Sequence, residues 1–273
     1  MRYLSFIGKQ LFSLTSSLVV ILNLGFWMFP LIGIAVIRSL IGGFEPLHNG
    51  CTKLIELCYK SAAAINSAWM IHVVRVHFKV DGTLPDHPTQ VIVVNHQTWF
   101  DIPILQHVVT GRGPILKFLI KRQLVWVPIV GWICYALNFP RLNRSGGGSA
   151  QREDFNAIKA ASSTMQKERG ALLIFAEGTR ITEEKHRNQN SPYKKLLIPR
   201  PGGLKIALST MPPDTPVVDI TINYNGGETN FWKCLHGANR NIDIHIEEHN
   251  AAAILDARSW LNDRWAQKDK RLQ

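Results

Sequence analysis

The stretch VIVVNHQTWFD, residues 91–101, carries the strongest indication of how this chain folds. Its first four residues form a continuous apolar run, which is typical of a strand buried on both faces of a sheet. The run leads directly into His96, and Asp101 lies just before the Ile-Pro pair at 102–103, where a proline suits the first turn of a helix. The stretch therefore predicts a strand, a short loop and a helix, with His96 and Asp101 at the strand end. Proteins with α/β folds place their functional sites at such strand ends.

A histidine backed by a carboxylate is a ready general base, because the carboxylate orients the ring and stabilises its protonated form. The spacing alone fits equally a core histidine that is hydrogen-bonded to Asp101 for structural reasons. The position at the exit of a buried strand favours the catalytic interpretation. We therefore take His96 and Asp101 as candidate catalytic residues.

A second short motif, EGTR at 177–180, follows another apolar run at 171–175. Gly178 can adopt backbone angles closed to other residues, so the chain can turn sharply there. The planar fork of Arg180 matches the oxygens of a phosphate group, although an ordinary ion pair with Glu177 also fits these residues. Together the two motifs suggest an enzyme that deprotonates a hydroxyl on a phosphate-bearing substrate.

Strand and helix patterns alternate along the rest of the chain. Alternating or continuous apolar residues predict further strands at 72–80, 171–175, 216–223 and 242–247. Helical patterns cover 151–168 and 251–265, a flexible break lies at 146–149, 121–136 is a mixed apolar segment, and 182–195 is a polar, basic loop. This alternation predicts an α/β fold with a central, mostly parallel or mixed sheet flanked by helices.

The N-terminal segment predicts attachment to a membrane. Residues 10–37 contain no Lys, Arg, Asp or Glu, and as a helix they would extend roughly 42 Å, more than the ~30 Å hydrocarbon core of a bilayer. Asn23 and Pro30 interrupt the run, so a single span and a bent or re-entrant hairpin both remain open. We predict membrane-anchoring helices in residues 1–70 and an α/β domain in 71–273.

The charge of the chain indicates an acidic partner. The formal net charge of +11 suits either nucleic acid or an anionic membrane surface. The basic loop at 182–195 contains one aromatic residue, Tyr193, whereas proteins that bind single-stranded nucleic acid usually present several. With the apolar N-terminus, this favours a lipid bilayer as partner and no nucleic acid. Four cysteines without a Cys-x-x-Cys spacing are typical of a reduced, cytosol-facing protein.

The pattern HIEEH at 245–249 spells an inverted zinc-protease motif. That motif requires a helix to bring both imidazoles to one metal ion. Here the surrounding residues alternate with period two and predict a strand, along which His245 and His249 would be separated by roughly 13 Å. Two ligands of one zinc ion cannot be so far apart, so we predict no metal site.

These motifs resemble those of the glycerophospholipid acyltransferase family, whose best-known members are 1-acyl-glycerol-3-phosphate acyltransferases. The first family motif, Asn-His-x-x-x-x-Asp, is present at 95–101, and the third, Phe-Pro-Glu-Gly-Thr-Arg, lies at 175–180 with Ala176 replacing the proline. The second motif is matched by Lys121, Leu124, Pro128, Gly131, Trp132, Phe139 and Arg141, and the fourth is approximated at 216–220. The segment LIPRPGG at 197–203 is similar to the branch that includes lysocardiolipin acyltransferases. The resemblance covers about residues 85–225.

The resemblance implies transfer of a fatty acyl group from a thioester to the free hydroxyl of a lysophospholipid, with lysophosphatidic acid giving phosphatidic acid. The donor would be acyl-CoA or acyl carrier protein, and no further cofactor is implied. The enzyme would act at a membrane, with its active site on the cytoplasmic face, as in a bacterial inner membrane. Another lysolipid acceptor such as lysocardiolipin, a membrane thioesterase or lipase, and a catalytically silent membrane adaptor remain alternatives.

The resemblance also implies roles for individual residues. His96 would remove the hydroxyl proton and return it to the departing thiol, while Asp101 holds the imidazole. The implied substrate-binding residues are Glu177, Gly178, Thr179, Arg180, Arg141 and Lys121. The three cationic side chains among them would bind the acceptor phosphate, and Glu177 would either orient the glycerol hydroxyl or brace Arg180.

Overall fold

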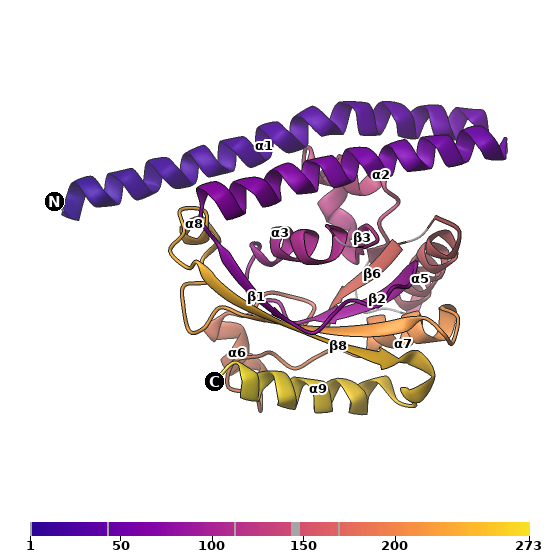
Figure 1. Ribbon diagram of the computed structural model, residues 1–273. Coiled ribbons are helices and arrows are strands. Elements are labelled where there is room, and N and C mark those ends of the chain that lie inside the picture. Colours follow the sequence, from indigo (N-terminus) through magenta and orange to yellow (C-terminus); the bar gives the residue numbers. More distant parts are fainter. Residues whose placement is uncertain (1, 43, 112, 143–147, 169) are drawn as a thin grey trace.

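The computed structural model describes residues 2–42, 44–111, 113–142, 148–168 and 170–273. Its centre is a six-stranded sheet with the order β1-β8-β7-β2-β6-β3 (Figure 1). The strands are β1 (His77–Asp81), β2 (Thr89–Val94), β3 (Leu116–Phe118), β6 (Gly170–Phe175), β7 (Pro216–Asn223) and β8 (Asn241–Asn250). Neighbouring strands are parallel except for β7 and β8, which are antiparallel, so the predicted mixed sheet is confirmed. A separate two-stranded sheet joins β4 (Ile120–Lys121) and β5 (Arg141–Leu142).

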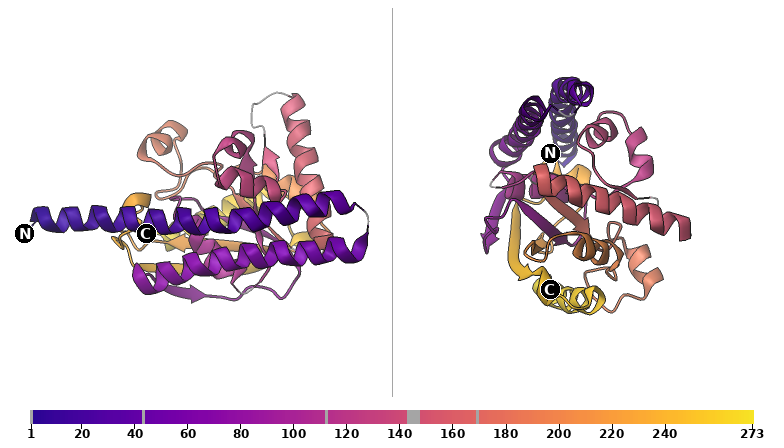
Figure 2. Two further views of the ribbon diagram at one scale, coloured as in Figure 1. Left: turned by 90° about the horizontal axis from the view of Figure 1, so that it is seen from above. Right: turned by 90° about the vertical axis from the view of Figure 1, so that its right-hand side faces the viewer.

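Helices cover both faces of the sheet (Figures 1 and 2). A hairpin of two long helices, α1 (Arg2–Ile41) and α2 (Glu45–Ala68), lies over one face with α3 (Asp101–Leu105) and α4 (Val130–Ala136). The other face is covered by α5 (Gly148–Glu168), α7 (Gly202–Thr210) and α9 (Ala257–Arg271). Two short helices follow strands along the chain: α6 (Glu183–Gln189) comes after β6, and α8 (Phe231–Cys234) comes after β7. The predicted α/β class is therefore confirmed.

Strand β2 shows why the apolar run at its centre is continuous. Ile92 and Val94 pack toward the hairpin, whereas Val91 and Val93 pack toward α5, α7 and α9. Every residue of the strand is consequently buried. Val94 is aligned with the last residue of β6 and with β7, so the loops that follow β2 and β6 begin at the same edge of the sheet.

The apolar run at 10–37 lies within one continuous helix, α1, and the chain turns back into α2 only after Ile41, so the turn does not lie at Asn23 or Pro30, where the sequence interrupts the run. Among the described residues, one helix is long and apolar enough to cross a membrane, Ser5–Ile41 within α1. Pro30 lies inside α1 without ending it. The helix packs along the α/β domain, and Ser13 Oγ donates a hydrogen bond to the carbonyl of Trp232 at 2.7 Å. These contacts attach α1 to the domain that follows it.

Two predicted segments on the hairpin side have different boundaries. The strand predicted at 72–80 begins at His77, because Trp69–Val73 continues α2 as a π-helical turn. The mixed segment 121–136 consists of a 3₁₀ turn, Arg122–Trp126, followed by α4.

Further differences lie on the opposite side. The predicted loop at 182–195 contains α6, because Thr182 caps a helix by accepting a hydrogen bond from the Lys185 amide at 3.2 Å. The last helix begins six residues later than predicted, where the side chain of Asp256 caps its first turn. Of the predicted break, residues 146 and 147 lie outside the described residues, and Gly148 already belongs to α5.

Candidate active site

The carboxyl end of β2 holds the predicted histidine–carboxylate pair. His96 Nδ1 and Asp101 Oδ2 are 2.8 Å apart, and Asp101 is completely buried at the start of α3. The same carboxylate oxygen accepts hydrogen bonds from the amides of Gln97 at 2.7 Å and Thr98 at 3.0 Å. The loop therefore wraps around the carboxylate. Because Nδ1 faces the carboxylate, Nε2 is the imidazole nitrogen that remains for proton exchange.

Tyr224 completes the environment of Asp101 and was not anticipated from the sequence. Its hydroxyl donates a hydrogen bond to Asp101 Oδ1 at 2.8 Å. Burial is the main reason why the pKa of Tyr224 lies well above its ordinary value, so the hydroxyl keeps its proton. Tyr224 directly follows β7. Asn95 attaches the loop at 95–101 to the same strand, because its Oδ1 accepts a hydrogen bond from the Ile222 amide at 2.9 Å. The sequence feature that could have indicated this role is the position of an aromatic residue directly after the strand predicted at 216–223.

Two aromatic rings hold the imidazole. Phe175 stacks on His96 with 3.8 Å between ring centroids and an interplanar angle of 19°. Trp99 meets His96 edge to face, with 6.4 Å between centroids. Phe175 ends β6 and Trp99 belongs to the loop after β2, so the meeting of the two strand ends fixes the ring in place.

Arg180 also contacts Trp99. Its guanidinium carbon is 4.6 Å from the centroid of the Trp99 ring, which is within cation–π distance. The loop that carries it turns at Gly178, whose φ of 71° lies in the left-handed region that favours glycine. Lys185 Nζ fixes the same loop by donating to Thr179 Oγ1 at 2.8 Å and to the Arg180 carbonyl at 3.1 Å.

Glu177 makes contacts that differ from both predicted roles. Its side chain is completely buried. Oε1 accepts a hydrogen bond from the His96 amide at 3.3 Å, and Oε2 accepts one from the Leu197 amide at 3.2 Å. Burial raises the pKa of Glu177 to about 8, although these two hydrogen bonds act in the opposite direction. The structure thus shows the carboxyl group bracing two loops of the site, and its predicted contact with the acceptor hydroxyl or with Arg180 stays a prediction.

Two further predicted residues lie in the small sheet. The Arg141 guanidinium is exposed and lies over the Tyr135 ring, 5.2 Å from its centroid. It is not among the residues that line the cavity described below. Lys121 belongs to β4, but its side chain lies outside the part of the chain that the structure describes. Phosphate binding by these two residues stays a prediction.

A cavity of about 810 Å³ connects the predicted site residues with the helical hairpin. His96, Gly178, Thr179 and Arg180 lie at its polar part. Its remaining walls are mainly apolar and come from α1, α2, α4 and β3 to β4. The volume falls within the 300–1,000 Å³ typical of small-molecule sites. The structure thus brings His96 and Arg180 to one chamber that could hold an aliphatic chain.

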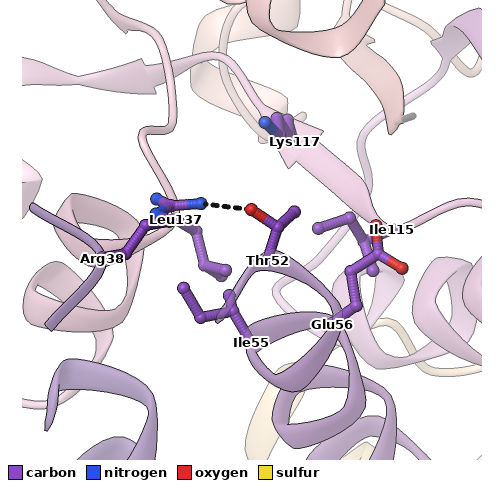
Figure 3. A pocket seen from close by; sticks show the side chains of 7 residues that line it. All are labelled: Arg38, Thr52, Ile55, Glu56, Ile115, Lys117 and Leu137. Atoms are coloured by element: carbon purple, nitrogen blue, oxygen red, sulfur yellow. Dashed lines mark hydrogen bonds between the residues drawn. The ribbon is translucent and has the colours of Figure 1, made fainter. Parts of the chain in front are cut away.

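A second pocket is much smaller and has a different character. It has a volume of about 10 Å³ and lies between the turn end of the hairpin and β3 (Figure 3). Arg38 Nη1 donates to Thr52 Oγ1 at 3.3 Å, and Glu56 and Lys117 line the same space. Such a volume admits about one water molecule. We therefore regard it as part of the contact between hairpin and domain rather than as a substrate site.

Charged residues also cluster between β7, β8 and α9. Ligand atoms of Asp219, Glu247 and His249 lie within 4.8 Å of one another, as a metal site would require. However, Lys268 Nζ lies 2.6 Å from Asp219 Oδ1, and Arg264 Nη1 lies 2.5 Å from Glu247 Oε2. These cations already neutralise both carboxylates and would repel a metal ion, so we assign none. The HIEEH pattern lies in β8, which confirms the predicted strand.

The geometry defines a class of protein. A histidine–carboxylate pair and a guanidinium at the edge of an apolar chamber, beside a helix apolar enough for a membrane, fit an enzyme that acts on lipids. The family model for "Acyltransferase" matches residues 75–223, more than half of the chain. The chain therefore belongs to the glycerophospholipid acyltransferase family.

Known relatives agree with this assignment. The chain is 27% identical over 199 residues to mouse 1-acyl-sn-glycerol-3-phosphate acyltransferase gamma, covering 66% of this chain and 51% of that protein. It is 30% identical over 145 residues to an uncharacterised acyltransferase of Schizosaccharomyces pombe, covering 51% and 46%. The chain spans about half the length of these curated relatives. The fold matches the crystal structure of PlsC, the 1-acyl-sn-glycerophosphate acyltransferase of Thermotoga maritima, with a TM-score of 0.61, 18% identity and 98% coverage of both chains.

Proposed function

We propose that this protein transfers a fatty acyl group from a thioester to the free hydroxyl of lysophosphatidic acid, giving phosphatidic acid. The observation that carries the proposal is the shared chamber. His96, paired with Asp101, and Arg180 both line the 810 Å³ apolar cavity. One place can thus hold a hydroxyl to be deprotonated, a phosphate and an aliphatic chain. The names of the relatives support lysophosphatidic acid as acceptor.

In the proposed reaction, His96 Nε2 takes the proton of the acceptor hydroxyl as its oxygen attacks the thioester carbonyl. A C–O bond forms, the tetrahedral intermediate collapses, and the C–S bond breaks. The imidazolium then returns the proton to the departing thiolate. A positioned base of this kind contributes roughly 10²–10⁴-fold to the rate. Asp101 holds Nδ1 in its protonated form throughout.

The acceptor phosphate is proposed to bind Arg180. Trp99 contacts both Arg180 and His96, so the phosphate and the hydroxyl would be bound next to two neighbours of this ring, in one chamber. A guanidinium presents two donors to phosphate oxygens and keeps its charge when partly desolvated. Arg141 and Lys121 would add further cations if the bound acceptor reaches the small sheet.

The acyl chain is proposed to occupy the apolar part of the cavity. Val20, Leu24, Trp27 and Leu31 of α1 line it at helical spacing, which corresponds to roughly 16 Å along the helix axis. A chamber walled by the hairpin allows a lipid to enter from the bilayer without crossing water. We propose the cytoplasmic face of a bacterial inner membrane as the location, and acyl-CoA or acyl carrier protein as the donor.

A second acceptor is favoured by one segment. Residues 197–203, which resemble the lysocardiolipin branch, lie against the site because the Leu197 amide donates to Glu177 Oε2. The Arg200 amide likewise donates to the Ala176 carbonyl at 2.7 Å. A larger lysolipid such as lysocardiolipin would therefore meet this segment at the acceptor side.

The test is a transfer assay with purified full-length protein, a panel of lysolipids and both donor types, with products identified by mass spectrometry. We expect phosphatidic acid from lysophosphatidic acid, and no trapped acyl-enzyme. Release of free fatty acid without acylated product would support a thioesterase instead. Unchanged behaviour of a His96→Ala variant in every assay would support a silent adaptor.

A further inference from the structure

A second apolar surface lies beside the exposed apolar face of the hairpin helices, on the segment that contains α4. Three aromatic side chains of one short segment form it: Trp126, Trp132 and Tyr135. We call this group the aromatic patch. Trp126 is 84% exposed, Tyr135 60% and Trp132 47%. Large aromatic side chains this exposed usually mark a site where another apolar phase is met.

The segment that carries the aromatic patch is also a wall of the cavity. Leu124, Val127, Val130, Ile133 and Cys134 line the chamber from the same turn and helix. The wall is thus apolar on both sides, with the substrate chamber behind it and the aromatic patch in front. A segment that faced water would be expected to carry polar residues on its outer side.

The backbone fixes this orientation. At Gly131 an added Cβ would lie 2.3 Å from the Val125 carbonyl oxygen, so α4 is pressed against the preceding 3₁₀ turn. Ile129, with φ 65° and ψ −68°, is the centre of a tight turn in which the Val130 amide donates to the Pro128 carbonyl at 2.7 Å. A β-branched residue rarely adopts these angles. The turn therefore holds Ile129 in an unfavourable conformation, and the helix that follows it exposes Trp132 and Tyr135.

The distribution of charged residues around the aromatic patch and its contact with α1 indicate which kind of partner the patch binds. Residues 123–140 carry no charged side chain, whereas Arg122 and Arg141 stand at the two ends. Aromatic residues flanked by arginine are typical of the interface between lipid headgroups and hydrocarbon. Helix α4 also contacts α1, whose outer face exposes Phe26 and Phe29. The aromatic patch therefore continues the apolar surface of the hairpin.

We propose that the aromatic patch inserts into the interfacial zone of a lipid bilayer, as a second membrane contact besides the hairpin. The two contacts lie next to each other, so the wall between them separates the chamber from lipid rather than from water. An acceptor could then pass from the bilayer into the chamber beside this wall. The inference goes beyond acyl transfer, because it concerns a surface that touches neither reacting group.

The experiment measures the depth of single positions in vesicles. Full-length protein with Cys51→Ser, which removes the one half-exposed cysteine, receives Trp126→Cys, Tyr135→Cys, Leu18→Cys or Leu255→Cys. An environment-sensitive fluorophore is attached to each introduced thiol. Leu18 is exposed on α1, and Leu255 is 96% exposed just before α9, so they serve as hairpin and water controls. Vesicles contain phosphatidylcholine and phosphatidylglycerol, with and without a nitroxide-labelled lipid.

We expect a blue shift on adding vesicles and a loss of emission with nitroxide lipid for labels at 126, 135 and 18, and neither change at 255. Labels at 126 and 135 that stay in water overturn the proposal, whatever the label at 18 reports. Labels at 126 and 135 already shielded without vesicles, in protein that sediments as an oligomer, overturn it in favour of contact between two copies. The measurement uses no substrate, so it fails or succeeds independently of the proposed acyl transfer.

Discussion

Two buried carboxylates on opposite faces of the sheet are each paired with a basic side chain, but their surroundings differ. Asp101 lies 2.8 Å from His96 on the hairpin face, and Asp219 lies 2.6 Å from Lys268 on the α9 face. Lys268 is completely buried and also donates to the Ile220 carbonyl at 2.6 Å. His96 instead lines the large cavity.

The difference separates the pair that we propose to be reactive, His96 with Asp101, from a structural one, Lys268 with Asp219. In the structural pair the ammonium group has protein partners and no route to a ligand. Burial is the main cause of the lowered pKa of Lys268, and the negative charge of Asp219 partly offsets this by raising that pKa. In the reactive pair the carboxylate is saturated by its own loop and by Tyr224, so that the imidazole keeps one nitrogen for substrate. Removing His96 should therefore lower activity and leave stability nearly unchanged, whereas removing Lys268 should lower stability and leave the activity of the folded protein nearly unchanged.

The largest effect is expected for His96→Ala. Without a proton acceptor the transfer rate should fall by roughly 10²–10⁴-fold or more, whereas the melting temperature should stay close to that of the unmodified protein. Steady-state assays and thermal unfolding of the same preparation measure both quantities. His72→Ala, at an exposed histidine outside the cavity lining, is the control and should keep full activity. Retained transfer in His96→Ala would remove the general-base role.

The converse is expected for Lys268→Met. Breaking a buried pair leaves an uncompensated charge and typically costs about 3–5 kcal/mol of unfolding free energy. The folded fraction should nevertheless turn over at a nearly normal rate, because Asp219, Ile220 and Thr221, to which the Lys268 ammonium binds, are not among the cavity-lining residues. Chemical denaturation measures the loss, with Lys270→Met as an exposed control on the same helix. Adding Asp219→Leu should restore most of the stability, and a double variant as unstable as the single one would contradict the ion-pair account.

The reactive pair could be predicted from the sequence because it is local. His96 and Asp101 belong to one short loop between a strand and a helix, and both elements have strong patterns of their own. The strand at 171–175 was equally clear, since a parallel strand covered on both faces is apolar throughout, and the strand at 216–223 was indicated by its alternating pattern.

The partners that distinguish the two pairs could not be predicted. Tyr224 reaches Asp101 because β7 lies beside β2, and Lys268 reaches Asp219 because α9 folds back under the sheet. Both contacts depend on strand order and on a returning helix, which no local pattern specifies. The contacts of Glu177 could not be predicted for the same reason, since its amide donors lie in two separate loops.

A smaller effect is expected for Arg180→Ala. Hydrogen bonds to a charged group contribute about 1.5–3 kcal/mol, so the KM for the acceptor should rise roughly 10- to 100-fold while the KM for the donor changes little. Initial rates with each substrate varied in turn give the two constants. Arg187→Ala, a well-exposed arginine in α6, is the matched control and should leave both constants unchanged. Equal increases in both would speak against phosphate recognition by Arg180.

The smallest effect is expected for Tyr224→Phe, which tests most directly how the surroundings of Asp101 differ from those of Asp219. The variant keeps the ring but removes the donor to Asp101 Oδ1, and the loss of one hydrogen bond of about 1 kcal/mol corresponds to a fall in kcat/KM of roughly fivefold. A carboxylate with one donor fewer stabilises the imidazolium more strongly, so the acidic limb of the pH–rate profile should move to higher pH. A purely structural tyrosine would lower stability without moving that limb. Tyr193→Phe, whose hydroxyl lies 3.4 Å from the Asn262 carbonyl far from the dyad, should change neither the rate nor the profile. A Tyr224→Phe profile that superimposes on that of the unmodified enzyme would show that Asp101 is positioned by its own loop alone.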